Sequence, residues 1–221
     1  MWIGAGVIGI PVITVLILLK LFTTRPAEYN PIAQQPSQQV SSYLTHELAP
    51  SFNNQIQLDK PFRIIVDQKG LNEIIVNEEN LGWSWPINLN GVTFSAPSIV
   101  LAQDTIYLMG AVDVGFPVII SMIAKPKIDE QGKLWLNLLK IKAGSINITG
   151  PARSIGGKIF DRQMQFYKDQ WVRDAAGAFL KNTPFDPVFP VPPYKRFIRL
   201  TEAQVQDQKL ILIFEPAGSY K

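Results

Sequence analysis

Short apolar runs alternate with polar breaks between residues 91 and 148, a pattern typical of consecutive β-strands. The breaks carry glycine, proline and acidic residues that favour turns, and Glu130-Gln131-Gly132 is typical of a hairpin turn. The pattern therefore predicts an antiparallel meander, whose strands are VTFSA, SIVLA, TIYLMGAV, FPVIISMIA, KLWLNLLKIK and SINIT. Further strands are predicted at residues 62–66, 197–200 and 210–214.

The spacing of apolar residues becomes helical after Gly150-Pro151. Intervals of three and four residues place six apolar side chains on one face of a helix, namely Phe160, Met164, Tyr167, Trp171, Ala175 and Ala178. The pattern predicts one helix over residues 153–181, about 40 Å long. Shorter helices are predicted after Ser37 and after Asp67, whose carboxylate can cap the start of a helix.

The most apolar stretch of the chain is residues 2–22, which Lys20 alone interrupts. Because about 20 apolar residues in a helix span the hydrocarbon core of a bilayer, residues 1–22 are predicted to be a transmembrane anchor. A cleaved signal peptide would need a basic leader, a shorter apolar core and a small-residue cleavage site, none of which is present. Residues 23–37, with three prolines, are predicted to be a linker to a single domain at residues 38–221.

The orientation of this anchor is open. Lys20 and Arg25 follow the apolar stretch, and the positive-inside rule would place the larger C-terminal part in the cytoplasm. Two basic residues are a weak bias, so the charge pattern by itself does not decide the topology.

The composition removes several kinds of chemistry. The chain of 221 residues has no cysteine, which excludes thiolate metal sites, thiol nucleophiles and disulfides, and His46 is its one histidine. The glycines near Lys158 do not form a phosphate-binding loop, because Ala152 and Ile159 stand where that motif needs glycine and a hydroxyl side chain. We therefore expect no enzyme activity, no catalytic residue, no metal and no cofactor. The net charge of +3 without a basic stripe also gives no reason to expect nucleic-acid binding.

Two predicted strands are apolar on both faces, at residues 118–124 and 134–139. One face of such a strand can pack on a helix, and the other face needs a second cover. That cover is either more protein or an apolar ligand, and the strands alone leave both readings open.

Three segments resemble the YpmS-like family of membrane-anchored bacterial proteins. Residues 62–76 resemble the family's strand followed by a helix with a Leu-Asn pair, here Leu71-Asn72. Residues 125–136 (KPKIDEQGKLWL) are similar to its hairpin, and residues 198–212 resemble its last two strands, although Gln208 stands where the family has a turn glycine. The order of elements also resembles LmeA-like and SMP-like tubular lipid-binding domains.

This resemblance implies an α+β fold in which a curved antiparallel sheet wraps around the long helix and leaves an apolar groove. It implies a membrane-anchored, non-enzymatic domain that binds or handles lipid, in a cell membrane with its C-terminal domain outside the cytoplasm. The implied partners are membrane lipid and a membrane protein. Candidate groove residues are Phe116, Val118, Ile120, Met122, Trp135, Leu139, Phe160, Met164, Tyr167 and Trp171. The alternative is a protein-interaction or scaffold module of a membrane complex, which would use the proline-rich residues 183–193 or a sheet edge.

Overall fold

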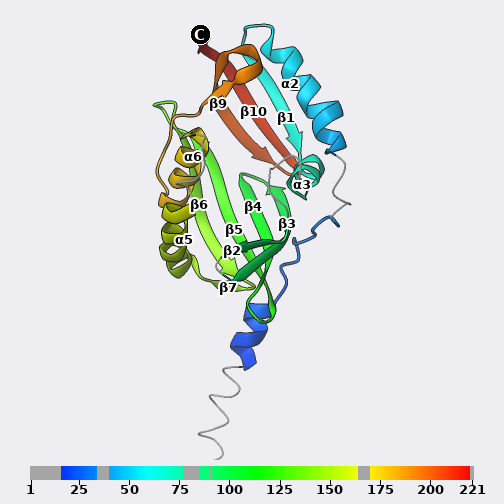
Figure 1. Cartoon of the computed structure of the whole chain (residues 1–221), viewed down its shortest axis with the longest axis vertical. Helices are drawn as coiled ribbons and strands as arrows, with labels where there is room; N and C mark the ends of the chain where they lie inside the picture. Colours follow the sequence, from blue (N-terminus) through cyan, green and yellow to red (C-terminus); the bar gives the residue numbers. More distant parts are fainter. Residues whose placement is uncertain (1–15, 34–39, 77–84, 90, 164–169, 220–221) are drawn as a thin grey trace, which may run out of the picture.

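The computed structural model describes residues 16–33, 40–76, 85–89, 91–163 and 170–219, of which 89, 158–163 and 170–172 are described by their backbone only. Two antiparallel sheets follow one another along the long axis of the molecule (Figure 1). The four-stranded sheet has the order β1-β10-β9-β8, with β1 (Phe62–Asp67), β8 (Val188–Val191), β9 (Arg196–Gln206) and β10 (Lys209–Ser219). The six-stranded sheet is a meander of β2 (Ile87–Leu89), β3 (Val92–Ala102), β4 (Thr105–Asp113), β5 (Pro117–Ile128), β6 (Leu134–Ala143) and β7 (Ile146–Asn147).

Six described helical segments accompany these sheets between residues 44 and 194. They are η1 (Leu44–Leu48), α2 (Ala49–Ile56), α3 (Gln68–Val76), α5 (Thr149–Gln163), α6 (Gln170–Lys181) and η3 (Pro192–Tyr194). The predicted meander and the α+β class are confirmed. The predicted cap of the helix after residue 67 is also confirmed, because the Asp67 carboxylate accepts a hydrogen bond from the Gly70 amide at 2.7 Å.

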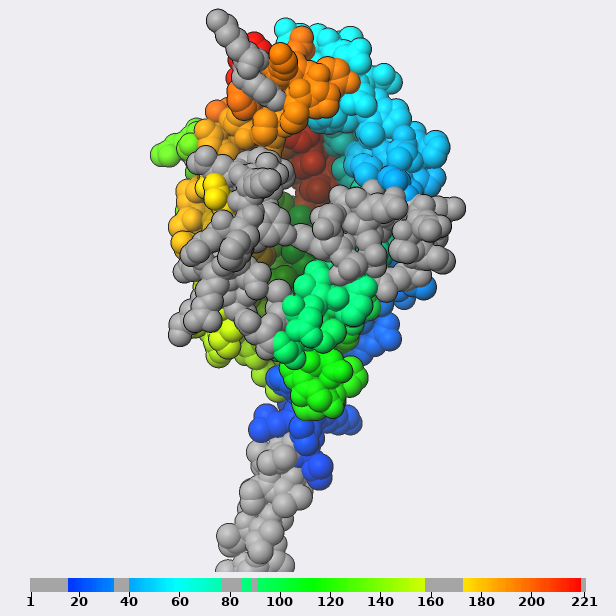
Figure 2. All heavy atoms as spheres, in the orientation of Figure 1, coloured from blue at the N-terminus to red at the C-terminus, as the bar shows by residue number. Residues whose placement is uncertain are grey.

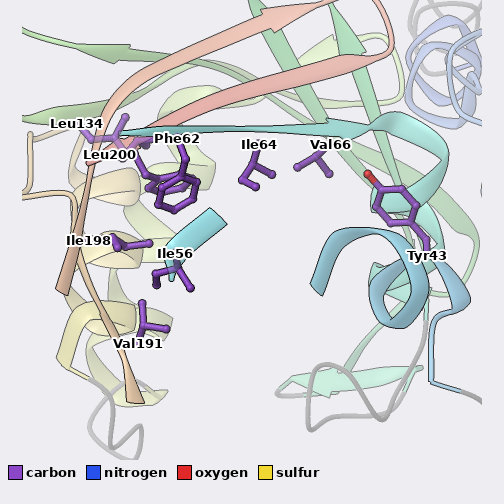
Figure 3. Packing of buried hydrophobic residues seen from close by; sticks show 10 residues of the cluster. Tyr43, Ile56, Phe62, Ile64, Val66, Leu134, Val191, Ile198 and Leu200 are labelled. Atoms are coloured by element: carbon purple, nitrogen blue, oxygen red, sulfur yellow. The ribbon is translucent and has the colours of Figure 1, made fainter. Parts of the chain in front are cut away.

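The main core lies between the four-stranded sheet and the helix that passes through η1 and α2. Phe62, Ile64 and Val66 alternate along β1 and point toward this helix (Figure 3), where Phe62 packs on Phe52. The side chains of Ile56 and Tyr43 complete this side of the cluster. The strand predicted at residues 62–66 is therefore present, with one buried and one open face.

The single long helix predicted at residues 153–181 is wrong. A Cβ atom on Gly156, in α5, would lie 3.6 Å from Leu180 Cδ2, in α6. In one straight helix these two positions would be about 36 Å apart. The two helices therefore pack side by side, each much shorter than predicted, and residues 164–169 between them lie outside the described residues. A sheet wrapped around one long helix, as in tubular lipid-binding domains, is not the fold of this chain.

The predicted single-pass membrane protein is also corrected. Within the part of the chain that the structure describes, no helix is long and apolar enough to cross a membrane. Residues 1–15, most of the predicted anchor, lie outside the described residues. The predicted location in a cell membrane, with an extracytoplasmic domain, was based on a transmembrane helix and is therefore not supported.

The segment predicted as a linker packs on the six-stranded sheet over part of its length. Tyr29 is 5% exposed, and its hydroxyl donates a 2.7 Å hydrogen bond to the Ala96 carbonyl in β3. Just before this segment, the Leu21 carbonyl accepts a bond from the Ser145 amide, and the Phe22 ring meets Phe116 edge to face. These contacts fix the path of residues 21–29 along the sheet.

Backbone hydrogen bonds join the two sheets at their hairpin tips. The Gln208 amide, in the β9–β10 turn, donates to the Leu101 carbonyl at 2.9 Å, and the Asp104 amide donates to the Val205 carbonyl at 3.0 Å. Gln208 has φ 60, the left-handed conformation that a turn glycine would adopt more easily. The strands on either side of this turn, β9 and β10, are longer than predicted, because residues 201–206 continue the ladder.

The proline-rich segment, residues 183–193, forms a second connection between the two sheets, because it bonds to β6 of one and to β9 of the other. Phe185 exchanges two backbone hydrogen bonds with Leu134 at the start of β6, at 2.9 and 3.1 Å. Pro187 is less than 2% exposed, and its carbonyl accepts the Leu200 amide of β9. Residues 188–191 then pair with β9 as β8, so this segment holds the sheets together within the chain.

Candidate functional site

One face of the six-stranded sheet is apolar at every described position from β3 to β6. Cross-strand partners share a face, and in the centre Leu108 pairs with Met122, Gly110 with Ile120, and Val112 with Val118. We call this surface the apolar face. Its members on β3 and β4 are Phe94, Ile99, Leu101, Ile106, Leu108, Gly110 and Val112, and those on β5 and β6 are Val118, Ile120, Met122, Ala124, Pro126, Ile128, Leu134, Leu136, Leu138, Ile141 and Ala143.

The apolar face is buried at its margins and open at its centre. Leu101 and Val118 are each 2% exposed, whereas Leu108, Ile120 and Met122 are only half-buried. Figure 2 shows the molecule hollowed where the two sheets meet, with β10 (dark red) and strands of the six-stranded sheet (green) deep in the hollow. Large apolar side chains in the middle of a sheet therefore retain contact with the outside, which is the usual mark of an interaction site.

The apolar surface continues from the six-stranded sheet onto the four-stranded one. Ile99 and Leu101 of β3 form a buried cluster with Val205 of β9, and Leu71 of α3 and Leu210 of β10 pack against it. The joined hairpin tips bring these strands together, so side chains of both sheets and of α3 enclose one end of the apolar face.

Three of the ten residues predicted to line a groove lie together on the apolar face, and three lie elsewhere. Val118, Ile120 and Met122 share the face because they alternate along β5. Phe116 precedes β5 in the turn, 38% exposed. Trp135 pairs with Lys127 on the opposite face, where its ring nitrogen donates to Asp129.

Leu139 lies off the apolar face for a related reason. The register of β6 against β5 shifts between Ile123 and Ala124, which leaves Leu139 without a partner and 48% exposed. The four remaining candidates, Phe160, Met164, Tyr167 and Trp171, have side chains outside the described residues.

Strand β4 contributes residues that the sequence analysis did not select. Leu108, Gly110 and Val112 lie opposite the three residues of β5 that share the face. The alternation in TIYLMGAV carries this signal, because every second residue of a strand points to the same side. The pattern within β4 does not show which of its two faces adjoins Val118, Ile120 and Met122. That requires the register between β4 and β5.

The opposite face of the same sheet is mixed. Met109 and Ile123 are buried there, as is Ser121, whose hydroxyl has no partner among the described residues, whereas Lys125 is exposed. Tyr29 covers part of this side at β3. Both faces of the sheet therefore bear buried apolar side chains, and each of them needs a cover.

A second concave feature lies between η1, α2 and the edge of β1. This pocket of about 300 Å³ is lined by Tyr43, Glu47, Leu48, Ser51, Ile65, Asp67 and Lys209. Its polar atoms serve the fold: the Tyr43 hydroxyl accepts a hydrogen bond from the Asp67 amide at 3.2 Å, and Asp67 caps α3. Burial raises the pKa of Tyr43, with smaller effects from nearby Asp67 and Glu47. The pocket offers a mixture of charges without a nucleophile and base in contact.

Groups with metal-binding or catalytic potential are sparse. Among the described residues, no cluster of three or more histidine and acidic side chains is placed to hold a metal ion. His46 is exposed, and its Nδ1 lies within hydrogen-bond distance of Thr45 Oγ1 at 2.9 Å and of the Ser42 carbonyl at 3.1 Å. The expectation that the protein is not an enzyme stays a prediction.

Comparison with known proteins adds no relative. No family model matches the chain, and no curated protein sequence matches it either. The resemblance to the YpmS-like family stays a prediction, and the apolar face is the feature of the structure that points to a function.

Proposed function

We propose that the protein binds the hydrocarbon chain of a lipid on the apolar face. The observation that carries this proposal is the half-exposed centre of a surface on which every described strand position is apolar, around Leu108, Ile120 and Met122. The hollow beside it leaves room for a ligand next to this surface (Figure 2).

The chemistry of the face selects a ligand without polar groups in the bound part. A polar atom buried there would lose its hydrogen bonds to water without gaining a partner from these side chains, at a cost of about 1–3 kcal/mol. By contrast, each methylene group that leaves water contributes about 0.8 kcal/mol. An acyl chain gains along its whole length, and its head group remains outside the face.

The proposal is tested by titrating the full-length protein with a fluorescent fatty acid. Ile120→Asn and Met122→Gln keep the side-chain size while adding an amide to the centre of the apolar face. We expect each variant to weaken binding at least about tenfold, because the amide must lose its hydration when the chain binds.

Ile119→Asn is the matched control, since residue 119 is half-buried on the opposite face of the same strand. It should bind as the unaltered protein does. Circular dichroism verifies that all three variants fold. Equal affinities for all of them, or no binding by the unaltered protein, would contradict the proposal.

A second experiment needs no added probe. Native mass spectrometry of the full chain, purified without detergent, should show a fraction with added mass that organic extraction identifies as lipid. Ile120→Asn should lose this fraction and Ile119→Asn should retain it. The same added mass in both variants would place the lipid elsewhere on the molecule.

A further inference from the structure

Strand β1 lies at an edge of the four-stranded sheet, because β10 is its only neighbour among the described strands (Figure 1). In an antiparallel pair, successive residues direct their main-chain N–H and C=O groups alternately to the neighbouring strand and outward. The Asp67 amide donates to the Tyr43 hydroxyl, whereas the next amide, of Gln68, donates back into the β9–β10 turn. This alternation places the outward main-chain groups on Arg63, Ile65 and Asp67.

The outward groups of Arg63 and Ile65 have no hydrogen-bond partner in the part of the chain that the structure describes. Both side chains are exposed, and 49% of the surface of Ile65 is in contact with the outside. At the edge of the six-stranded sheet, by contrast, side chains of Gln68 and Asn72 bond to the main chain of β3. An edge strand with open main-chain groups and an exposed apolar side chain is a template for one more strand.

The pocket between η1, α2 and β1 adds a pattern of charge to this edge. Ile65, Asp67 and the exposed carboxylate of Glu47 line it, and Lys209, the cross-strand partner of Asp67, offsets one of the two negative charges. Neither Glu47 nor Arg63 forms an ion pair with another described residue. The edge is therefore acidic where β1 ends and basic where it begins.

We infer that two copies of the protein associate through β1, edge to edge and antiparallel. Pairing Arg63 of each copy with Ile65 of the other uses all of the open main-chain groups on both strands. It also brings the basic start of one strand to the acidic end of the other. The stem of each Arg63 covers the exposed Ile65 of the other copy, and its guanidinium extends toward Asp67 and Glu47 there.

This association joins two four-stranded sheets into one continuous sheet with a two-fold axis between the two β1 strands. The added ladder ends at Asp67, whose amide the Tyr43 hydroxyl already occupies. The contact uses no residue of the apolar face, so the inference does not depend on the proposed lipid binding.

Analytical ultracentrifugation of the full chain measures the association, and the unaltered protein should form a dimer whose fraction rises with concentration. Arg63→Glu faces the carboxylates of the other copy, and Ile65→Lys faces its Arg63. Each should raise the Kd of the dimer at least about tenfold, because like charges meet in the contact. Arg63→Lys keeps the charge and should still dimerise. Lys181→Glu, an equal charge change at an exposed position in α6, is the matched control.

Single thiols test the register, since the chain has no cysteine of its own. Equal amounts of the Arg63→Cys and Ile65→Cys proteins are mixed and oxidised. The mixed disulfide should form faster than either homodimeric one, because Cβ atoms of directly paired residues lie about 5 Å apart and those of diagonal neighbours about 7–8 Å. A disulfide joins Cβ atoms about 4 Å apart.

Circular dichroism verifies that each variant folds. A protein that stays monomeric up to its highest soluble concentration overturns the inference, as does a monomer that pairs this edge with a strand of a different protein. A dimer that Arg63→Glu and Ile65→Lys leave intact overturns it too, since another surface, such as the exposed apolar side chains between residues 16 and 21, would then hold it. Arg63→Glu should bind the fluorescent fatty acid as the unaltered protein does, so each proposal can fail without the other.

Discussion

At the scale of single residues, Asn72 joins α3 to the six-stranded sheet as a strand would. Its side-chain amide donates to the Ile99 carbonyl at 2.7 Å and accepts from the Ile99 amide at 2.7 Å. Its second donor interaction, to the Gln68 carbonyl, measures 2.8 Å, and the residue is 6% exposed. All of its polar atoms therefore have hydrogen-bond partners in a buried position, where the loss of each bond lowers the free energy of unfolding.

Asn72→Ala should lower the free energy of unfolding by about 2–4 kcal/mol, because it leaves both main-chain groups of Ile99 without this partner. Urea denaturation followed by circular dichroism measures the change. Asn54→Ala, at an exposed position in α2, is the control and should change stability by less than about 0.5 kcal/mol. A loss below about 1 kcal/mol for Asn72→Ala would show that the amide contributes little.

Glu73 holds the start of the helix that leads into η1. One carboxylate oxygen accepts bonds from the Ser41 hydroxyl at 2.9 Å and from the Tyr43 amide at 3.0 Å. The amide of Tyr43 lowers the pKa of Glu73 most, burial opposes this effect, and the Ser41 hydroxyl lowers the pKa further. The Ser41 hydroxyl oxygen also accepts a 3.1 Å bond from the Leu44 amide, so the carboxylate from another helix adds to a local cap.

The lowered pKa of Glu73 predicts an acid-sensitive contribution to stability. Because the folded state favours the ionised carboxylate, the contribution is complete above the unfolded-state pKa and is lost as the pH falls through the folded-state pKa. Glu73→Gln should therefore be less stable than the unaltered protein at neutral pH, and the difference should shrink in acid. Ser41→Ala should show a smaller difference with the same trend. A difference that stays constant with pH would contradict this role.

At the scale of elements, the sequence predicts the strands better than it predicts their faces. The meander and its hairpin turn follow from local signals, and Val118, Ile120 and Met122 follow from alternation along one strand. Trp135 was assigned to the wrong side because a bulge at Leu139 shifts the register of β6, and a bulge leaves no mark in the pattern of apolar residues. A partner strand is needed to see it.

The helical prediction fails for a similar reason. Periodic spacing over residues 153–181 indicates helix but does not say whether the helix is continuous. The contact of Gly156 with Leu180 divides it into α5 and α6, which is a tertiary effect. The importance of Asn72 also depends on a distant residue, Ile99, so the Leu71-Asn72 pair could be noted in the sequence without its physical role.

Helix side chains close open edges of the six-stranded sheet on both sides. At β3, the Leu101 amide donates to Gln68 Oε1 at 2.8 Å, next to the bonds of Asn72. At β6, the Leu138 amide donates to Asn182 and the Leu138 carbonyl accepts from Arg153 at 2.6 Å. Main-chain groups that could pair with another strand are thus occupied, which guards the sheet against edge-to-edge association.

At the scale of the whole molecule, residues 21–29 bind along the side opposite the apolar face, where Tyr29 is the buried anchor. The Arg25 guanidinium stabilises the position of Tyr29. It donates a 3.0 Å hydrogen bond to the Tyr29 carbonyl and lies 5.0 Å from the centre of the Tyr29 ring. Burial raises the pKa of Tyr29, so its hydroxyl stays protonated as the donor to Ala96.

Tyr29→Phe removes that donor and should destabilise the attachment of this segment by about 1 kcal/mol. We expect faster proteolytic cleavage within residues 23–33 and unchanged resistance in the sheets. Tyr107→Phe, on β4, is the control, since its hydroxyl has no hydrogen-bond partner among the described residues. Equal cleavage rates for Tyr29→Phe and the unaltered protein would show that other contacts suffice to hold the segment.

The pairing of β1 with β10 has a consequence for how the chain is made. Phe62 lies opposite Phe214, so among the described strands β1 pairs only with β10, about 150 residues later in the sequence. During synthesis, β1 therefore has no strand partner until β10 has left the ribosome, although the earlier η1–α2 helix can already cover its apolar side chains. Pairings between such distant segments also slow folding, because a long loop must close before they form. The six-stranded meander, built from neighbouring hairpins, can form earlier and provide the surface on which β9 and β10 then pack.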